Sequence, residues 1–88
     1  MANIDSAEKK NRQRLRRRAR NVYHLTTMRT HIKRVRVAVV DKDAGTARSA
    51  LAEAIRLIDK AAQKGVIKKQ SAARQKSRLT LAVNAVTA

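Results

Sequence analysis

Residues 22–40 read VYHLTTMRTHIKRVRVAVV, and their apolar side chains recur every three or four positions. This period places them on one face of an α-helix: Val22, Leu25, Met28, Ile32, Val35 and Val39. The helical pattern runs back to Asp5 and Ser6, either of which can cap a helix, and Asp5 with Glu8 resembles a capping box. We therefore predict one helix over about residues 6–40.

The upstream half of this helix is poor in apolar residues, because only Leu15 and Ala19 extend the stripe before Val22. A helix of this length spans roughly 50 Å, at about 1.5 Å per residue. The remaining chain is too short to cover such a length. We therefore expect the N-terminal half of the helix to project from the fold.

Two breaks divide the rest of the chain into two more helices, at about residues 45–63 and 69–86. Asp43 or Thr46 can cap the second helix, and Gly65 suits the left-handed position that ends it. The expected core side chains of these two helices are small and aliphatic: Ala47, Leu51, Ala54, Ile58, Ala61, Ala72, Leu79, Val83 and Val86. Short connections make neighbouring helices antiparallel. The predicted fold is therefore all-α, an up-down-up antiparallel three-helix bundle with a long, projecting, basic first helix.

The composition supports a single small helical domain, which we expect to span residues 1–88. The 88 residues include 22 Lys and Arg against 6 Asp and Glu, a formal net charge of +16, with 43% hydrophobic residues. The absence of cysteine excludes disulfides and thiolate metal sites, and the absence of proline favours long helices. No apolar run approaches the roughly 20 residues of a membrane span, and no signal peptide is visible. These features predict a helical, polyanion-binding protein.

The positive charge is concentrated in two parts of the sequence. Residues 1–36 carry a net charge of +10, residues 37–60 are neutral, and residues 61–88 carry +6. The densest run contains no acidic residue: Lys9, Lys10, Arg12, Arg14, Arg16, Arg17, Arg18 and Arg20. A solvated helix face normally alternates sign, and arginine suits bidentate contact with phosphate, so we interpret this run as a phosphate-binding surface. We expect it to be frayed alone and helical on a polyanion.

Two further basic sets extend this surface. One spans the second connection and the third helix: Lys64, Lys68, Lys69, Arg74, Lys76 and Arg78. The other lies on the polar face of the first helix: Arg29, Lys33, Arg34 and Arg36. Lys68 and Lys69 share the positive end of the third helix's dipole, which favours a phosphate there. We expect the basic regions to lie at opposite ends of a narrow bundle, so that one protein contacts two separated phosphate strands.

The other candidate chemistries have little support in the sequence. Tyr23 is the sole aromatic side chain besides the histidines, which favours recognition of the nucleic-acid backbone over base stacking. We expect Tyr23 to pack beside the apolar stripe. His24 and His31 stand seven positions apart with no carboxylate close in sequence, which argues against a metal site. No catalytic constellation is recognisable, so we expect neither enzymatic activity nor a cofactor.

Several segments, taken in order and spacing, resemble one family across essentially the whole chain. They are Met1-Ala2-Asn3-Ile4, Ser6-Ala7, Lys9-Lys10, Met28-Arg29-Thr30, Ile32-Lys33, Lys64-Gly65-Val66-Ile67 and Ala72-Ala73-Arg74-Gln75-Lys76-Ser77-Arg78-Leu79. Together they resemble the bacterial small-subunit (30S) ribosomal protein S20 family. The resemblance implies a cytoplasmic, ribosome-bound three-helix bundle that binds 16S ribosomal RNA directly and bridges RNA helices during assembly. We expect no membrane, small-molecule or homo-oligomeric partner.

The resemblance also implies positions for the RNA contacts. Carried over residue by residue, they fall on the basic run over residues 9–20 and on six further positions: Arg29, Lys33, Lys69, Arg74, Lys76 and Arg78. The charge pattern by itself adds Arg34 and Lys68. Asp5 and Glu8 stand where the family often has basic residues, which favours a capping role there.

Two alternatives come from other functional classes. A small chromosomal or regulatory DNA-binding protein would share the charge, but the second and third helices are too long for a helix-turn-helix pair. A membrane-surface protein would place Trp, Phe or Leu opposite the basic face, and residues 9–20 offer only Leu15 and Ala19 there.

Overall fold

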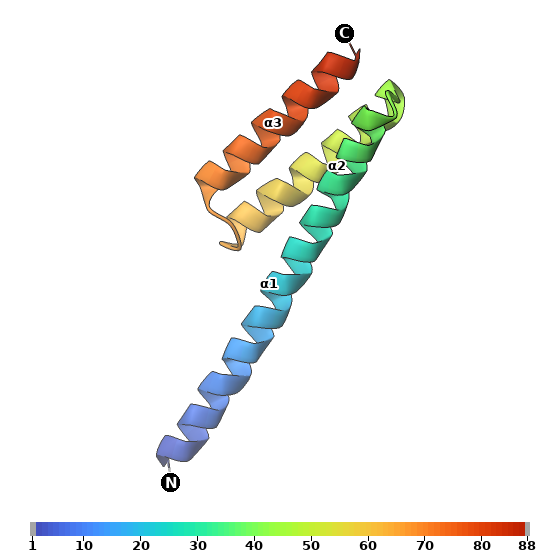
Figure 1. Cartoon of the computed structure of the whole chain (residues 1–88). Helices are drawn as coiled ribbons and strands as arrows, with labels where there is room; N and C mark the ends of the chain where they lie inside the picture. Colours follow the sequence, from blue (N-terminus) through green and yellow to red (C-terminus); the bar gives the residue numbers. More distant parts are fainter. Residues whose placement is uncertain (1, 88) are drawn as a thin grey trace.

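The chain folds into three α-helices. The computed structural model describes the backbone of residues 2–87 and the side chains of residues 4–87. Within that range there is no strand, and the helices are α1 (Ala2–Val40), α2 (Ala44–Gln63) and α3 (Lys69–Thr87). In Figure 1, α2 runs back alongside α1, and α3 then returns in the direction of α1. The predicted all-α, up-down-up antiparallel bundle is therefore confirmed.

The first helix begins earlier than the capping pattern predicts. It starts at Ala2, so Asp5 lies inside its first turn and does not precede it. The prediction that Asp5 or Ser6 caps the helix is wrong, because Asn3 and Ile4 continue the helix towards the N-terminus. A carboxylate in the first turn still favours the helix through its dipole. Met1 and Ala88, the two ends of the expected domain, lie outside the described residues.

The first connection is a tight turn closed by a side-chain cap. Lys42 has a left-handed φ of 57°, and the Asp43 backbone N–H donates to Ala38 O at 3.0 Å, which ends α1. Asp43 is the N-cap of α2: its Oδ1 accepts from the Thr46 N–H at 3.2 Å, and its Oδ2 accepts from Thr46 Oγ1 at 2.7 Å. The sequence prediction for this cap is confirmed.

This cap makes the stability depend on pH. The Thr46 hydroxyl and then the Thr46 backbone N–H lower the pKa of the Asp43 carboxyl, because both donate to its ionised form. The carboxylate therefore contributes its stabilisation above the ordinary pKa of about 4, and loses it as the pH falls through the lowered value.

We expect Asp43→Ala to lower Tm by roughly 4–8 °C at pH 7, and the difference from the unsubstituted chain to shrink as the pH falls below the ordinary aspartate pKa of about 4. Thermal melts followed by circular dichroism measure both effects. Asp41→Ala removes the same charge and leaves the cap in place, so it is the matched control. Equal shifts in Tm for the two variants would contradict the capping role.

The second connection confirms the predicted glycine stop. Gly65 has a φ of 74°, and its N–H donates to Ala62 O at 3.1 Å. The Val66 N–H donates to Ala61 O at 2.9 Å, which completes the end of α2. Val66 and Ile67 then pack against the core, so the connection is folded onto the bundle.

The core is built from small aliphatic side chains, and α2 lies between the other two helices. Its contacts with α1 and with α3 both outnumber those that α1 and α3 make with each other. The buried residues are Met28, Ile32, Val35, Ala38, Ala47, Ala54, Ile58, Ala61, Ala72, Leu79 and Val83. Five of these are alanines, whose short side chains let helix axes approach closely. Of the nine core residues predicted on α2 and α3, seven are buried and Leu51 packs against them, but Val86 is only partly buried and lies outside the core.

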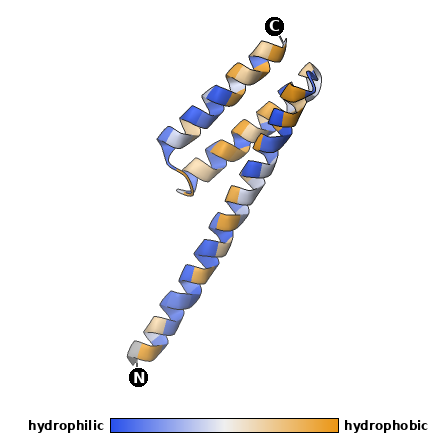
Figure 2. Ribbon diagram, in the orientation of Figure 1, coloured by the Kyte–Doolittle hydropathy of each residue, from blue (hydrophilic) through white to orange (hydrophobic). Residues whose placement is uncertain are grey.

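The predicted stripe on α1 is only partly buried. Met28, Ile32 and Val35 enter the core, but Val22 is 53% exposed, and Ala38 is more deeply buried than Val39 in the last turn. Val22 lies beside the end of α2, which reaches Arg20, but at 100° per residue it is turned away from the buried face. The stripe residues before Arg20 extend past α2. The molecule measures 66 × 21 × 14 Å along its principal axes. Figures 1 and 2 show the N-terminal half of α1 projecting as a hydrophilic rod, which confirms the predicted projection.

The projecting half is a continuous helix and is not frayed, contrary to expectation. Residues 9–20 contain no glycine, proline or β-branched residue, and arginine, lysine and glutamine are good helix formers. The helix is also continuous with the segment held in the bundle, so the costly nucleation step is already made.

Candidate nucleic-acid interface

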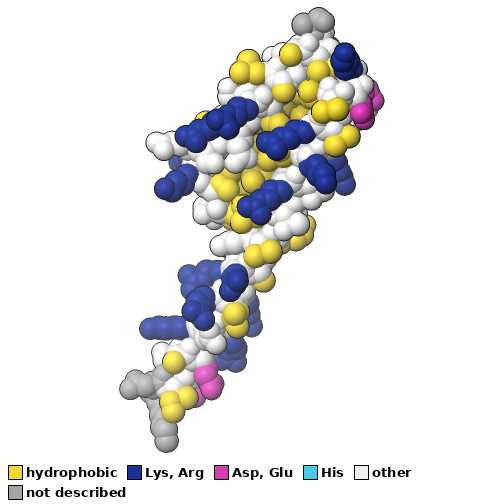
Figure 3. Space-filling model, in the orientation of Figure 1, with side chains coloured by type: hydrophobic (Ala, Val, Ile, Leu, Met, Phe, Trp, Pro, Cys, Tyr) yellow, Lys and Arg dark blue, Asp and Glu magenta, His cyan; other side chains and the backbone are white. Residues whose placement is uncertain are grey.

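The N-terminal half of α1 is an exposed polycation. We call residues 4–20 the stalk; every one of these residues is exposed. At 100° per residue, the eight cations of residues 9–20 point to all sides of the helix except one strip that holds Leu15 and Ala19. Figure 3 shows these Lys and Arg side chains standing out from the rod. Phosphates can therefore approach the stalk from several directions.

The stalk carries unfavourable electrostatic interactions. Lys10, Arg14 and Arg18 stack one turn apart, and so do Arg12, Arg16 and Arg20. Each like-charge pair at this spacing costs about 0.2–0.5 kcal/mol, and a bound polyanion removes the repulsion. Arg14 Nη2 also donates to Asn11 Oδ1 at 3.0 Å, which leaves most of the guanidinium free to bind a ligand.

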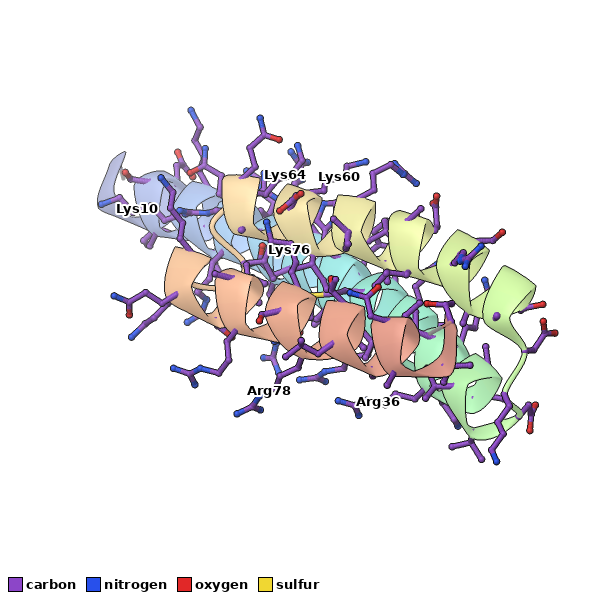
Figure 4. The ribbon with its side chains drawn as sticks, turned by 90° about the horizontal axis from the view of Figure 1, so that it is seen from above. Lys10, Arg36, Lys60, Lys64, Lys76 and Arg78 are labelled. Carbon is purple, nitrogen blue, oxygen red and sulfur yellow. The ribbon has the colours of Figure 1, made fainter. Side chains whose placement is uncertain are left out.

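A second basic surface lies between α1 and α3. Arg29, Lys33 and Arg36 of α1 and Arg78 of α3 line a groove, which we call the basic groove. Leu25, Met28, Ile32 and Ile67 also line it, together with Gln75. Figure 4 shows Arg36 and Arg78 pointing to the same side of the bundle. The fold thus brings together cations that are more than forty positions apart in the sequence.

A third basic surface lies where the stalk meets the end of α2. Its lining residues form what we call the junction pocket: Arg20, Arg56, Asp59, Lys60, Gln63 and Lys64. Lys60 and Lys64 point to the side of the bundle opposite Arg36 and Arg78 in Figure 4. Lys60 and Arg56 were not predicted from the sequence, because they lie in a stretch whose net charge is zero.

His24 reports the positive field of the junction pocket. Partial burial, and then the charges of Lys60, Lys64 and Arg20, lower the pKa of His24 below its ordinary value. Its ring meets that of Tyr23 edge to face, with centroids 5.5 Å apart. Tyr23 is 66% exposed, so the prediction that it packs beside the apolar stripe is wrong. It lies in the exposed stretch where the stalk leaves the bundle.

The other predicted contact residues differ in availability. Arg34, Lys68, Lys69 and Arg74 are exposed. Lys76 is only partly exposed, and its Nζ donates to Asp59 Oδ1 at 2.7 Å in an ion pair between α3 and α2. Lys76 therefore has a role inside the bundle, which its position on the apolar stripe of α3 explains.

The basic regions do not lie at opposite ends of the bundle, and that expectation is wrong. Because α2 runs antiparallel to α1, the connection with Lys64, Lys68 and Lys69 lies at the end from which the stalk emerges (Figure 1). The opposite end carries Asp41 and Asp43, and we call it the acidic end. The basic surfaces instead occupy the stalk and two opposite sides of the bundle.

The described residues contain no group of three side chains that could hold a metal ion. No helix in the described part of the chain is long and apolar enough to cross a membrane.

The family description "Ribosomal protein S20" matches residues 2–84. The chain belongs to the ribosomal protein S20 family. Its similarity to S20 proteins extends over almost the full length of this chain and of each relative.

Three relatives illustrate the extent of this similarity. The small ribosomal subunit protein bS20 of Geotalea daltonii is 52% identical over 87 residues, which cover 99% of this chain and 100% of that protein. That of Citrifermentans bemidjiense is 51% identical over 84 residues, covering 96% and 97%. That of an Anaeromyxobacter species is 46% identical over 88 residues, covering 100% and 98%.

Proposed function

We propose that the chain is a non-enzymatic, structural constituent of the small ribosomal subunit that binds 16S ribosomal RNA directly and bridges RNA helices during assembly. Membership of the S20 family supports the ribosomal assignment. The observation that carries the RNA-binding step is the stalk, a helical rod with cations on nearly all sides and no contact with the core. The rest of the protein makes few contacts that stabilise such a rod, whereas surrounding phosphates would stabilise it through electrostatic attraction.

The arrangement of the basic surfaces supports bridging. The basic groove and the junction pocket lie on opposite sides of a bundle whose smaller dimensions are 21 and 14 Å. Two RNA segments on the two sides would each contact cations, and the stalk that projects from the bundle would contact phosphates beyond it. The opposite end, where Lys42 and Arg48 balance Asp41 and Asp43, attracts RNA less strongly than the stalk.

Recognition of shape is the proposed mechanism. Arginine and lysine contacts to phosphate position a protein without reading bases, and folded RNA presents phosphates in a distinctive geometry. The proposed contacts are Lys9, Lys10, Arg12, Arg14, Arg16, Arg17, Arg18, Arg20, Arg29, Lys33, Arg34, Lys68, Lys69, Arg74, Arg78 and, through its partly exposed side, Lys76. We also propose that residues 1–88 act as one cytoplasmic, ribosome-bound domain, without a membrane, small-molecule or homo-oligomeric partner.

Site-directed cleavage of 16S rRNA tests the bridge. The chain has no cysteine, so single cysteines can carry an iron chelate that cuts nearby RNA. Gln63→Cys lies in the junction pocket and Gln75→Cys in the basic groove, and neither substitution alters the charge. Asn84→Cys, exposed on α3 towards the acidic end, is the control.

We expect the Gln63 and Gln75 chelates to cut two different segments of 16S rRNA, and the Asn84 chelate to cut weakly. Cleavage of one shared segment by all three chelates would contradict the bridge. The absence of any cleavage above the cysteine-free background would contradict direct binding.

A further inference from the structure

We propose that the junction pocket is a discrete site for one backbone phosphodiester, bound by Arg20 from α1 together with Lys60 and Lys64 from α2. This inference rests on the proposed function, because it takes the phosphate to belong to RNA. It adds a site of defined composition, in which two helices must meet before the phosphate can be bound. The stalk, by contrast, offers cations that any nearby phosphate can use.

The geometry of the pocket follows from the antiparallel hairpin. Lys60 and Lys64 are four positions apart on α2, so their side chains stand one turn apart on the same face. They lie at the C-terminal end of α2, where the helix dipole favours cations. Because α1 passes this end, Arg20 joins them, and the three cations line one pocket.

The other charged residues that line the pocket are already paired. Asp59 would repel a phosphate, but its Oδ1 accepts from Lys76 Nζ at 2.7 Å. Arg56 forms an ion pair with Glu53 one turn earlier on α2. Among the described residues, Lys60 and Lys64 take part in no ion pair. The pocket thus presents three uncompensated cations and one neutralised carboxylate.

The neighbouring His24 lies in the field of these charges. Partial burial and the charges of Lys60, Lys64 and Arg20 all lower the pKa of His24. Tyr23, which meets the His24 ring, is the other titratable group facing it from α1. A phosphodiester in the pocket would cancel the repulsion on protonated His24 and raise its pKa. The titration of His24 can therefore be used to detect whether a phosphodiester occupies the junction pocket.

The test is an NMR titration of the full-length protein with the ribo-trinucleotide UpUpU, with neutral uridine as the control ligand. Internucleotide phosphodiesters keep one negative charge over the range in which histidine titrates, so a change in the titration of His24 belongs to the protein. His31, two turns further along α1 and outside the pocket, is the internal reference. Two charge-matched variants complete the design: K60Q/K64Q in the pocket and K42Q/R48Q at the other end of the bundle.

We expect UpUpU to shift the His24 ring resonances saturably and to raise its titration midpoint in the unsubstituted protein and in K42Q/R48Q. Neither change should occur in K60Q/K64Q or with uridine. At equal salt, K60Q/K64Q should bind 16S rRNA about tenfold more weakly than K42Q/R48Q, which removes the same number of charges outside the proposed contacts.

A His24 response that is absent from the unsubstituted protein, or unchanged in K60Q/K64Q, would overturn the site. If 16S rRNA binding persisted with either result, the site would fail and the proposed function would stand. If the His24 response occurred as expected in a protein that did not bind 16S rRNA, the phosphodiester site would hold and the proposed function would fail.

Discussion

Replacing the arginines at positions 12, 14, 16, 17 and 18 with glutamine should lower the affinity for 16S rRNA about 10³-fold at 0.1–0.2 M salt. Each phosphate that the variant no longer neutralises removes about 0.7–0.9 from the slope of log affinity against log salt, so the slope should fall by about 4. Filter binding over a salt series measures both quantities. The five side chains belong to the stalk, whose exposed cations form the largest group of positive charges outside the bundle.

The same variant should fold as well as the unsubstituted protein, or slightly better. Glutamine keeps the helix propensity, and its introduction removes the like-charge repulsion along the stalk. Lys42→Gln with Arg48→Gln, near the acidic end, is the control, and we expect its RNA affinity to change less than threefold. An equal loss of affinity per charge removed in the two variants would show that binding senses net charge alone, and would contradict a role for the stalk.

The largest expected effect on stability comes from Ile58→Ala. Ile58 is fully buried on α2, the helix between the other two. Truncation of a buried isoleucine to alanine costs about 2–5 kcal/mol, since transfer free energy is lost and a cavity remains. A bundle of this size has only about 5–10 kcal/mol of stability, so the variant should be largely destabilised at 37 °C.

Urea unfolding followed by circular dichroism measures this loss. Leu81→Ala is the matched control, because Leu81 is 66% exposed on α3 and its truncation should cost less than about 0.5 kcal/mol. A cost below about 1 kcal/mol for Ile58→Ala would contradict the assignment of this residue to the centre of the core.

The helical periods and the breaks between them were predictable, because they depend on local spacing and local turn chemistry. Asp43 and Gly65 act where the sequence placed them, at the start and just beyond the end of α2. The exposure of Val22 and Tyr23 was not predictable in this way. A stripe on one helix does not show how wide a face its partner helices cover. Both residues lie beside the end of α2, which reaches Arg20, but at 100° per residue they are turned away from the buried face of α1.

The charged surfaces show the same limit. The basic run over residues 9–20 was predictable from the sequence alone, and all of its cations are exposed in the structure. The junction pocket was not visible, because Arg20 and Lys64 meet only after the hairpin forms. Averaging charge over residues 37–60 also concealed Lys60, since the acids that balance it in the sequence include Glu53 and Asp59, which pair with other cations in space.

The most direct test of the account compares equilibrium binding to naked 16S rRNA, to an unrelated folded RNA and to duplex DNA over one salt series. We predict tighter binding to 16S rRNA that survives added salt better than binding to the two controls, with a slope that reflects roughly 6–10 neutralised phosphates. Equal affinities and equal slopes for all three nucleic acids would contradict a specific ribosomal contact and would make the chain a general polyanion binder.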